Sequence, residues 1–196
     1  MHITIAIMLA AVKLSSQGTG DALDDAIFKL ATDSNMPPPA GTSISWAQPG
    51  ALPANLPGFA ESEDPGIPAG NTAIVVNPLV VAEFWSRGAS AQETCDVVAA
   101  VLFHEYQHTP EYGEPSTDGE PGWGNGICAH IDVFISTQDF ICQLIDTRKS
   151  EGLSVYYLCR LADRYVGVIN SNLPARNSAC GPPPLDTLYL CNGCGE

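Results

Sequence analysis

Basic residues and long apolar runs are both scarce in this sequence of 196 residues. It has 8 Lys and Arg against 22 Asp and Glu, which gives a net charge of −14. A chain this acidic is repelled by a phosphate backbone, so we expect no nucleic-acid partner. No stretch reaches the roughly 18 consecutive apolar residues that a membrane-spanning helix needs, so the sequence predicts no transmembrane segment.

Sequence repeats are absent and histidine is rare, with only 4 in the chain. Apolar residues make up 45% and charged residues 15% of the sequence, a balance typical of a globular domain rather than a disordered chain. A chain of this length can bury a core of its own and suits one domain. We therefore expect a single domain over residues 1–196.

Cysteine, in contrast, is plentiful. Seven in a chain of this length are unusual for a reduced cytosolic protein and favour an extracytoplasmic or secreted location. The N-terminal part, residues 1–35, leaves two alternatives open. Residues 3–12 have the length of a signal-peptide core but lack a preceding Lys or Arg, and they also have the spacing of an amphipathic helix. Asp21 is expected to cap a second helix that ends at Lys29 or Ala31.

The pattern of the remaining chain predicts an α+β fold in which helices dominate. Residues 36–70 are rich in proline and glycine and predict a loop with one short strand at 43–47. Residues 71–77 are β-branched and predict the best strand. Helices are expected over 80–85, over 90–108 after the capping-box spacing of Ser90 and Glu93, and over 127–148 and 154–169. The tail, residues 170–196, is rich in cysteine and proline.

The residues that indicate chemistry are His104, Glu105 and His108, which form an HExxH motif. Residues i and i+4 share one helix face, so both histidines can offer a ring nitrogen to one metal ion. Glu105 lies about 100° further round the helix and can accept a proton from a metal-bound water. A chance match in a chain of this composition is expected at a rate on the order of 0.4%. The alternative is a pair of histidines on a solvated helix face.

A catalytic zinc site needs a third protein ligand. His130 is our first candidate, because it flanks the apolar face of the helix that follows the motif. Asp132 lies two residues further on, in a polar stripe that predicts a solvated face. The loop acids Glu111 and Glu114 are the other candidates.

The motif and the order of these elements resemble the zincin class of zinc metallopeptidases, in a gluzincin-like arrangement over the catalytic core at residues 71–150. The resemblance implies a small sheet before the active-site helix, with strand 71–77 at its edge, where an extended peptide binds. The chain departs from the gluzincin pattern, in which the third ligand is a Glu. Glu111 and Glu114 stand where the metzincin class has Gly and His.

The resemblance also implies an oxyanion-stabilising side chain. Since no histidine is left over, a tyrosine would have to serve, and four candidates remain open: Tyr112, Tyr156, Tyr157 and Tyr165.

The tail carries a second cysteine pattern, Cys191-Asn-Gly-Cys194, with Cys180 upstream. A structural zinc site would need a fourth ligand nearby, and a redox CxxC normally opens a helix. We therefore expect disulfides that attach the tail to the body of the protein.

These observations predict a zinc-dependent hydrolase, a metallopeptidase that cleaves peptide bonds in a peptide or protein substrate. One Zn²⁺ per chain would be held by His104, His108 and His130, and Glu105 would assist the attack of a zinc-bound water. The alternative is a non-catalytic, Cys-stapled secreted or effector domain with a structural metal site. Glu105 separates the two hypotheses, because a structural site needs no carboxylate beside its ligands.

Overall fold

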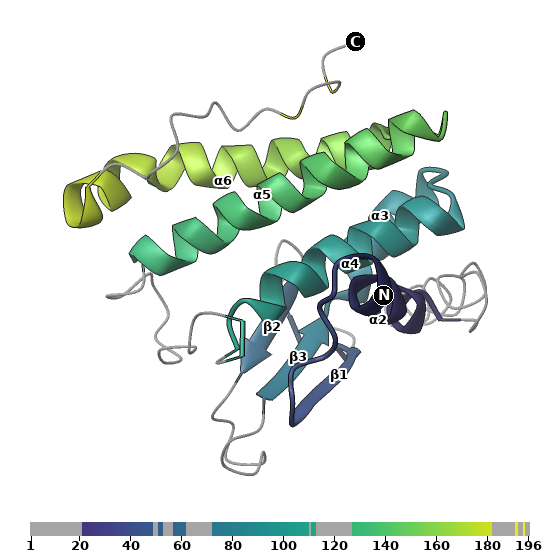
Figure 1. Cartoon of the computed structure of the whole chain (residues 1–196), viewed down its shortest axis with the longest axis horizontal. Helices are drawn as coiled ribbons and strands as arrows, with labels where there is room; N and C mark the ends of the chain where they lie inside the picture. Colours follow the sequence, from purple (N-terminus) through teal and green to yellow (C-terminus); the bar gives the residue numbers. More distant parts are fainter. Residues whose placement is uncertain are drawn as a thin grey trace. The chain divides into compact units, whose positions relative to one another are not determined.

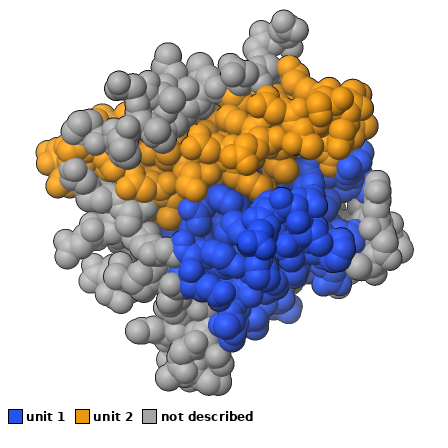
Figure 2. All heavy atoms as spheres, viewed as in Figure 1, with its two compact units in different colours: residues 1–116 blue, residues 117–196 orange. Residues whose placement is uncertain are grey.

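The computed structural model of the chain describes residues 21–48, 51–52, 57–61, 72–109, 111–112, 127–181, 191 and 194. The chain divides into two compact units, residues 1–116 (the first unit) and residues 117–196 (the second unit; Figure 2). The division falls within the predicted catalytic core, residues 71–150, so its two histidine-bearing helices belong to different units. The single domain over 1–196 stays a prediction. Both alternatives for residues 3–12 concern positions outside the described residues.

The first unit contains a three-stranded sheet in the order β1-β3-β2 (Figure 1). Strand β3 (Thr72–Val76) pairs in parallel with β1 (Thr42–Trp46) and antiparallel with β2 (Gly58–Glu61). Ile74 and Val76 of β3 are fully buried, as the β-branched pattern of this segment predicts. The strands expected at 43–47 and 71–77 are therefore confirmed.

Two features of the sheet differ from the expectations. Strand β3 is central, because it pairs on both sides, so the prediction that this segment forms a sheet edge is wrong. Strand β2 lies in the segment 36–70, where we predicted loop apart from one strand. It is four residues long and contains Gly58 and Ala60, which have low strand propensity. Its pairing with β3 defines it, and a local pattern cannot show such pairing.

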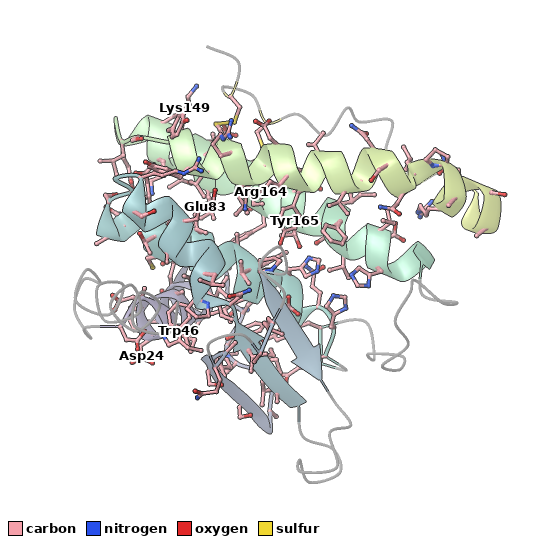
Figure 3. All side chains as sticks on the ribbon, turned by 180° about the vertical axis from the view of Figure 1, so that it is seen from behind. Asp24, Trp46, Glu83, Lys149, Arg164 and Tyr165 are labelled. Carbon is pink, nitrogen blue, oxygen red and sulfur yellow. A yellow bond between two sulfur atoms is a disulfide. The ribbon has the colours of Figure 1, made fainter. Side chains whose placement is uncertain are left out.

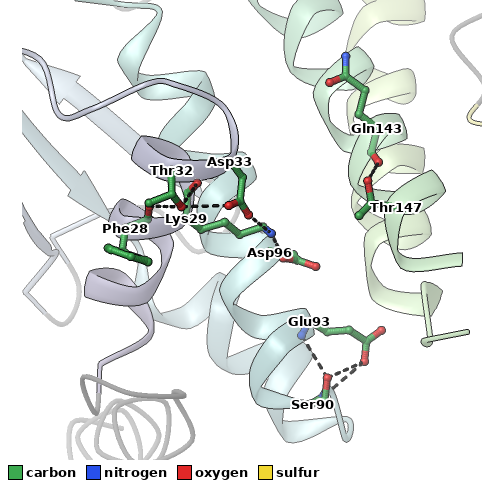
Figure 4. Close-up of polar contacts among 9 residues, drawn as sticks. All are labelled: Phe28, Lys29, Thr32, Asp33, Ser90, Glu93, Asp96, Gln143 and Thr147. Carbon is green, nitrogen blue, oxygen red and sulfur yellow. Dashed lines mark hydrogen bonds and ion pairs between the residues drawn. The ribbon is translucent and has the colours of Figure 1, made fainter. Parts of the chain in front are cut away.

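Helix α4 (Ala91–Tyr106) carries the motif and packs against β2, β3, α2 (Ala22–Asp33) and α3 (Pro78–Ser86). Each of the residues from Val97 to Leu102 is fully buried. The capping box that opens α4 is confirmed, since the Glu93 N–H donates to the Ser90 hydroxyl at 3.1 Å and the Ser90 N–H donates to the Glu93 carboxylate at 3.3 Å (Figure 4).

The predicted cap of α2 is confirmed as well. The Asp21 carboxylate accepts from the Leu23 N–H at 3.0 Å and from the Trp46 indole N–H at 3.0 Å. Figure 3 shows Trp46 on β1 beside this helix. A single carboxylate thus begins α2 and ties it to the sheet.

The second unit contains two long helices, α5 (Ile127–Ser150) and α6 (Tyr156–Cys180), which run antiparallel and pack along each other (Figure 1). Their core includes Ile131, Ile135 and Ile169. The helix predicted to end at residue 169 continues to 180, past Pro174. Its last turns are held by Arg176, which donates to the Asp132 carboxylate at 2.8 Å and to the Gly181 carbonyl at 2.6 Å.

The observed fold is helix-dominated with a small sheet, which is compatible with the predicted α+β class. Within the described residues, none of the helices has the length and apolar character required to cross a membrane.

Candidate metal centre

The two motif histidines lie at the C-terminal end of α4. His104 is in the last turn of the helix, whereas His108 lies two residues beyond the helix end at Tyr106. We predicted that the helix would run to about His108. Instead, the N–H of Gln107, of His108 and of Thr109 each donates to the carbonyl three residues earlier, which tightens the chain before Pro110.

This tight turn still brings the two rings together. The Nε2 atom of His104 lies 3.3 Å from the Nε2 atom of His108, and the ring planes cross at 74°. Two imidazole nitrogens bound 2.0–2.1 Å from a tetrahedral zinc ion are about 3.3 to 3.4 Å apart. The pair therefore has the spacing of two zinc ligands. The same spacing allows a hydrogen bond between the rings when one of the nitrogens carries a proton.

Glu105 lies between the two histidines in sequence and is directed against strand β2. Only 4% of its surface is exposed. A Cβ atom placed on Gly58 would lie 2.8 Å from Glu105 Oε1, so β2 passes very close to the carboxylate. Burial raises the pKa of Glu105 to about 8, and a hydrogen bond from the Ala60 N–H acts in the opposite direction.

His130 lies in the first turns of α5, in the second unit. It is partly buried, and its ring stacks on Phe134 one turn later with the ring centroids 5.5 Å apart. Phe134 in turn contacts Tyr165 of α6, with the ring centroids 5.2 Å apart. Burial lowers the pKa of His130, which favours the neutral form that binds metals.

His104, His108 and His130 can each offer one ligand atom to a metal ion; the first two belong to the first unit and His130 belongs to the second. The geometry within the first unit thus supports a metal centre at His104 and His108. Zinc as the bound ion and His130 as the third ligand stay predictions.

Two of the three competing third ligands are engaged elsewhere. Asp132 is exposed, as its polar stripe predicts, and its carboxylate accepts from Arg176 at 2.8 and 3.1 Å. The Glu111 carboxylate accepts from the Ala40 N–H at 2.7 Å. Glu114 lies outside the described residues.

The tyrosines proposed to stabilise an oxyanion have different surroundings. The Tyr112 hydroxyl donates to the Pro37 carbonyl at 2.8 Å, so this group is already committed. Tyr156 is exposed and packs edge-on against Tyr157, which is buried. Tyr165 is buried beside Phe134. A role for any of the four in an oxyanion site stays a prediction.

The predicted attachment of the tail by disulfides is confirmed. Cys191 pairs with Cys142 of α5, and Cys194 pairs with Cys159 of α6. The two cysteines of the CxxC pattern therefore bind different helices and not each other. This pairing excludes them as ligands of a tail zinc site and as a redox pair in this state.

Sequence reasoning missed Gly58 and Ala60, two β2 residues that lie against the Glu105 carboxylate. The segment offered only its glycine and proline content, which favours a loop.

No family model, no curated protein and no solved structure matches this chain.

Proposed function

We propose that this chain is a zinc-dependent hydrolase that cleaves peptide bonds. The observation that supports the proposal most strongly is the 3.3 Å separation between the Nε2 atoms of His104 and His108, with Glu105 beside them in the chain. In the proposal, these two histidines and His130 hold one Zn²⁺ per chain. The fourth position is left for water, as in catalytic zinc sites.

The proposed chemistry divides the work between the metal and Glu105. A zinc ion at this site would polarise the scissile carbonyl and make a bound water acidic enough to attack at neutral pH. Glu105 takes the proton from the attacking water oxygen and gives it to the amine nitrogen as the C–N bond breaks. The products are a carboxylic acid and an amine, and Glu105 returns to its original charge.

The proposed substrate is a peptide in an extended conformation. It cannot add to β3, which is paired on both sides, whereas β2 is an edge strand of the described sheet. We therefore place the substrate along β2, where backbone groups of the strand can pair with an added strand.

The two disulfides favour an oxidising compartment, such as the extracellular space, for this activity. They also favour the alternative function, a non-catalytic domain with a structural metal site. Disulfides stabilise the second unit whether or not the protein has a catalytic role.

Glu105→Gln tests the proposal against this alternative. The zinc-loaded wild type and variant are incubated with a mixed peptide library, and the cleavage products are read by mass spectrometry. We expect the wild type to cleave and the variant to lose about 100-fold or more of the rate, since a general base contributes on that scale, while zinc content stays the same. Equal cleavage by both proteins, or zinc-loaded wild type that cleaves nothing, would overturn the enzyme proposal.

A further inference from the structure

At Gly58, strand β2 approaches Glu105 more closely than a residue with a side chain would allow. A Cβ on Gly58 would lie 2.8 Å from Glu105 Oε1, 3.1 Å from Glu105 Cγ and 2.8 Å from Val101 Cγ1. These distances are shorter than non-bonded carbon contacts, which are optimal at about 3.5–4.0 Å. Only glycine at this position leaves room for the carboxylate where it lies.

A backbone donor of the same strand faces the carboxylate. The Asn77 N–H donates to the Pro57 carbonyl at 2.8 Å, and Ala60 is opposite Ile74. Because hydrogen-bonded and non-hydrogen-bonded pairs alternate in an antiparallel ladder, the N–H of Ala60 faces away from β3. This N–H donates to the Glu105 carboxylate.

We propose that β2 is a positioning strand for Glu105, in which Gly58 provides the space for the carboxylate and the Ala60 N–H fixes its orientation. This inference rests on the proposed function, in which Glu105 moves the proton. A glutamate side chain has many rotamers, and a proton acceptor must stay within hydrogen-bond reach of the attacking water. Two contacts from one strand restrict the carboxylate to a single place.

The arrangement also has a consequence for the substrate. The outward N–H of Ala60 is occupied by Glu105, so a peptide that adds along β2 cannot use this donor. Its pairing must rely on the other outward groups of β2, those of Gly58 and the Ala60 carbonyl.

Two substitutions in the full-length protein test the positioning role. Ala60→Pro removes the N–H that binds Glu105. It removes no ladder bond, because this N–H faces away from β3, and proline is tolerated at such edge positions. Gly58→Ala fills the space. Gly167→Ala on α6 is the matched control, because a Cβ added at Gly167 would meet nothing within 4 Å. We expect the first two to lower kcat by about tenfold or more. KM and the zinc dissociation constant should stay within about twofold, because the histidines are untouched.

Two further readouts separate positioning from a general structural effect. In the Glu105→Gln background, neither substitution should lower the residual rate further. In the metal-free protein, Gly58→Ala should lower the melting temperature by several degrees, and by clearly less in a Glu105→Ala background, because contacting residues are coupled.

The outcomes distinguish this inference from the proposed function. If the wild type cleaves peptides and both variants keep kcat within twofold, the positioning role is wrong. If the wild type cleaves nothing, the proposed function is wrong. The coupling of melting temperatures then decides whether β2 holds Glu105, and additive effects would overturn the inference.

Discussion

Asp96 of α4, which is fully buried, lies 3.6 Å from the Nζ atom of Lys29 on α2 (Figure 4). Burial alone would lower the pKa of Lys29, but the hydrogen bond to Asp33 and the charge of Asp96 outweigh it, so the pKa of this lysine is raised. The pair connects the helix that carries the motif to α2.

Lys29→Met is therefore expected to destabilise the protein. It removes the Lys29 cation from beside the buried Asp96 carboxylate, at a cost of about 2–4 kcal/mol, since the lysine side chain retains some exposure. Chemical denaturation followed by circular dichroism measures the change. Asp33→Asn is the matched control, because Asp33 is an exposed partner of the same lysine, and it should cost less than about 0.5 kcal/mol. Equal losses in the two variants would contradict the assigned role of Asp96.

The histidine pair makes a prediction about metal affinity. His104→Ala and His108→Ala should each weaken zinc binding by about 100-fold or more, since each removes one ligand. Gln107→Ala alters the turn between the two histidines without removing a ring nitrogen and should leave affinity within about threefold. Competition with a chromophoric chelator measures these constants. If the histidine variants bound zinc as tightly as the control, the 3.3 Å contact would be a hydrogen bond between the rings and not a metal site.

His130 can be tested against its neighbour on the same helix. His130→Ala should reduce zinc affinity on the same scale as loss of a motif histidine. Asp132→Asn should leave affinity unchanged, because this carboxylate is engaged by Arg176, and should instead weaken the end of α6. Zinc titration and hydrogen exchange of residues 170–180 read the two effects. An opposite ranking of zinc affinities would make Asp132 the third ligand.

The disulfides are expected to stabilise the second unit. They close loops with sequence separations of 49 and 35 residues, and losing one from a small unit costs about 2–5 kcal/mol. Cys142→Ser with Cys191→Ser should therefore lower the melting temperature, and adding a reductant should lower that of the wild type further. Cys95→Ser is the control, since Cys95 forms neither of these disulfides. A melting temperature unaffected by reductant would contradict this contribution.

Local features of the structure could be predicted from the sequence, and contacts between distant segments could not. The Asp21 cap and the Ser90–Glu93 capping box join residues two or three positions apart, so their spacing alone reveals them. The HExxH spacing similarly predicted that the two histidine rings lie together, although His108 lies beyond the end of α4. Strand β2 and its contact with Glu105 join segments more than 40 residues apart, and Gly58 gave no sign of this role.

Helix α6 illustrates the same limit. The sequence predicts a helix that ends at residue 169, before a tail rich in cysteine and proline. The helix continues to residue 180, and Arg176 in its last turns binds Asp132, which is 44 residues away. The third metal ligand is likewise expected from outside the HExxH motif. The sequence alone therefore reduced the choice of this ligand to a few candidates.

Zinc K-edge X-ray absorption of the zinc-loaded, full-length protein tests the central claim most directly, because it reports the atoms bound to the metal. We predict three imidazole nitrogens at about 2.0 Å and one oxygen, the coordination of a catalytic site with an open position. Sulfur at about 2.3 Å, or fewer than two imidazole ligands, would contradict a zinc centre built on His104 and His108.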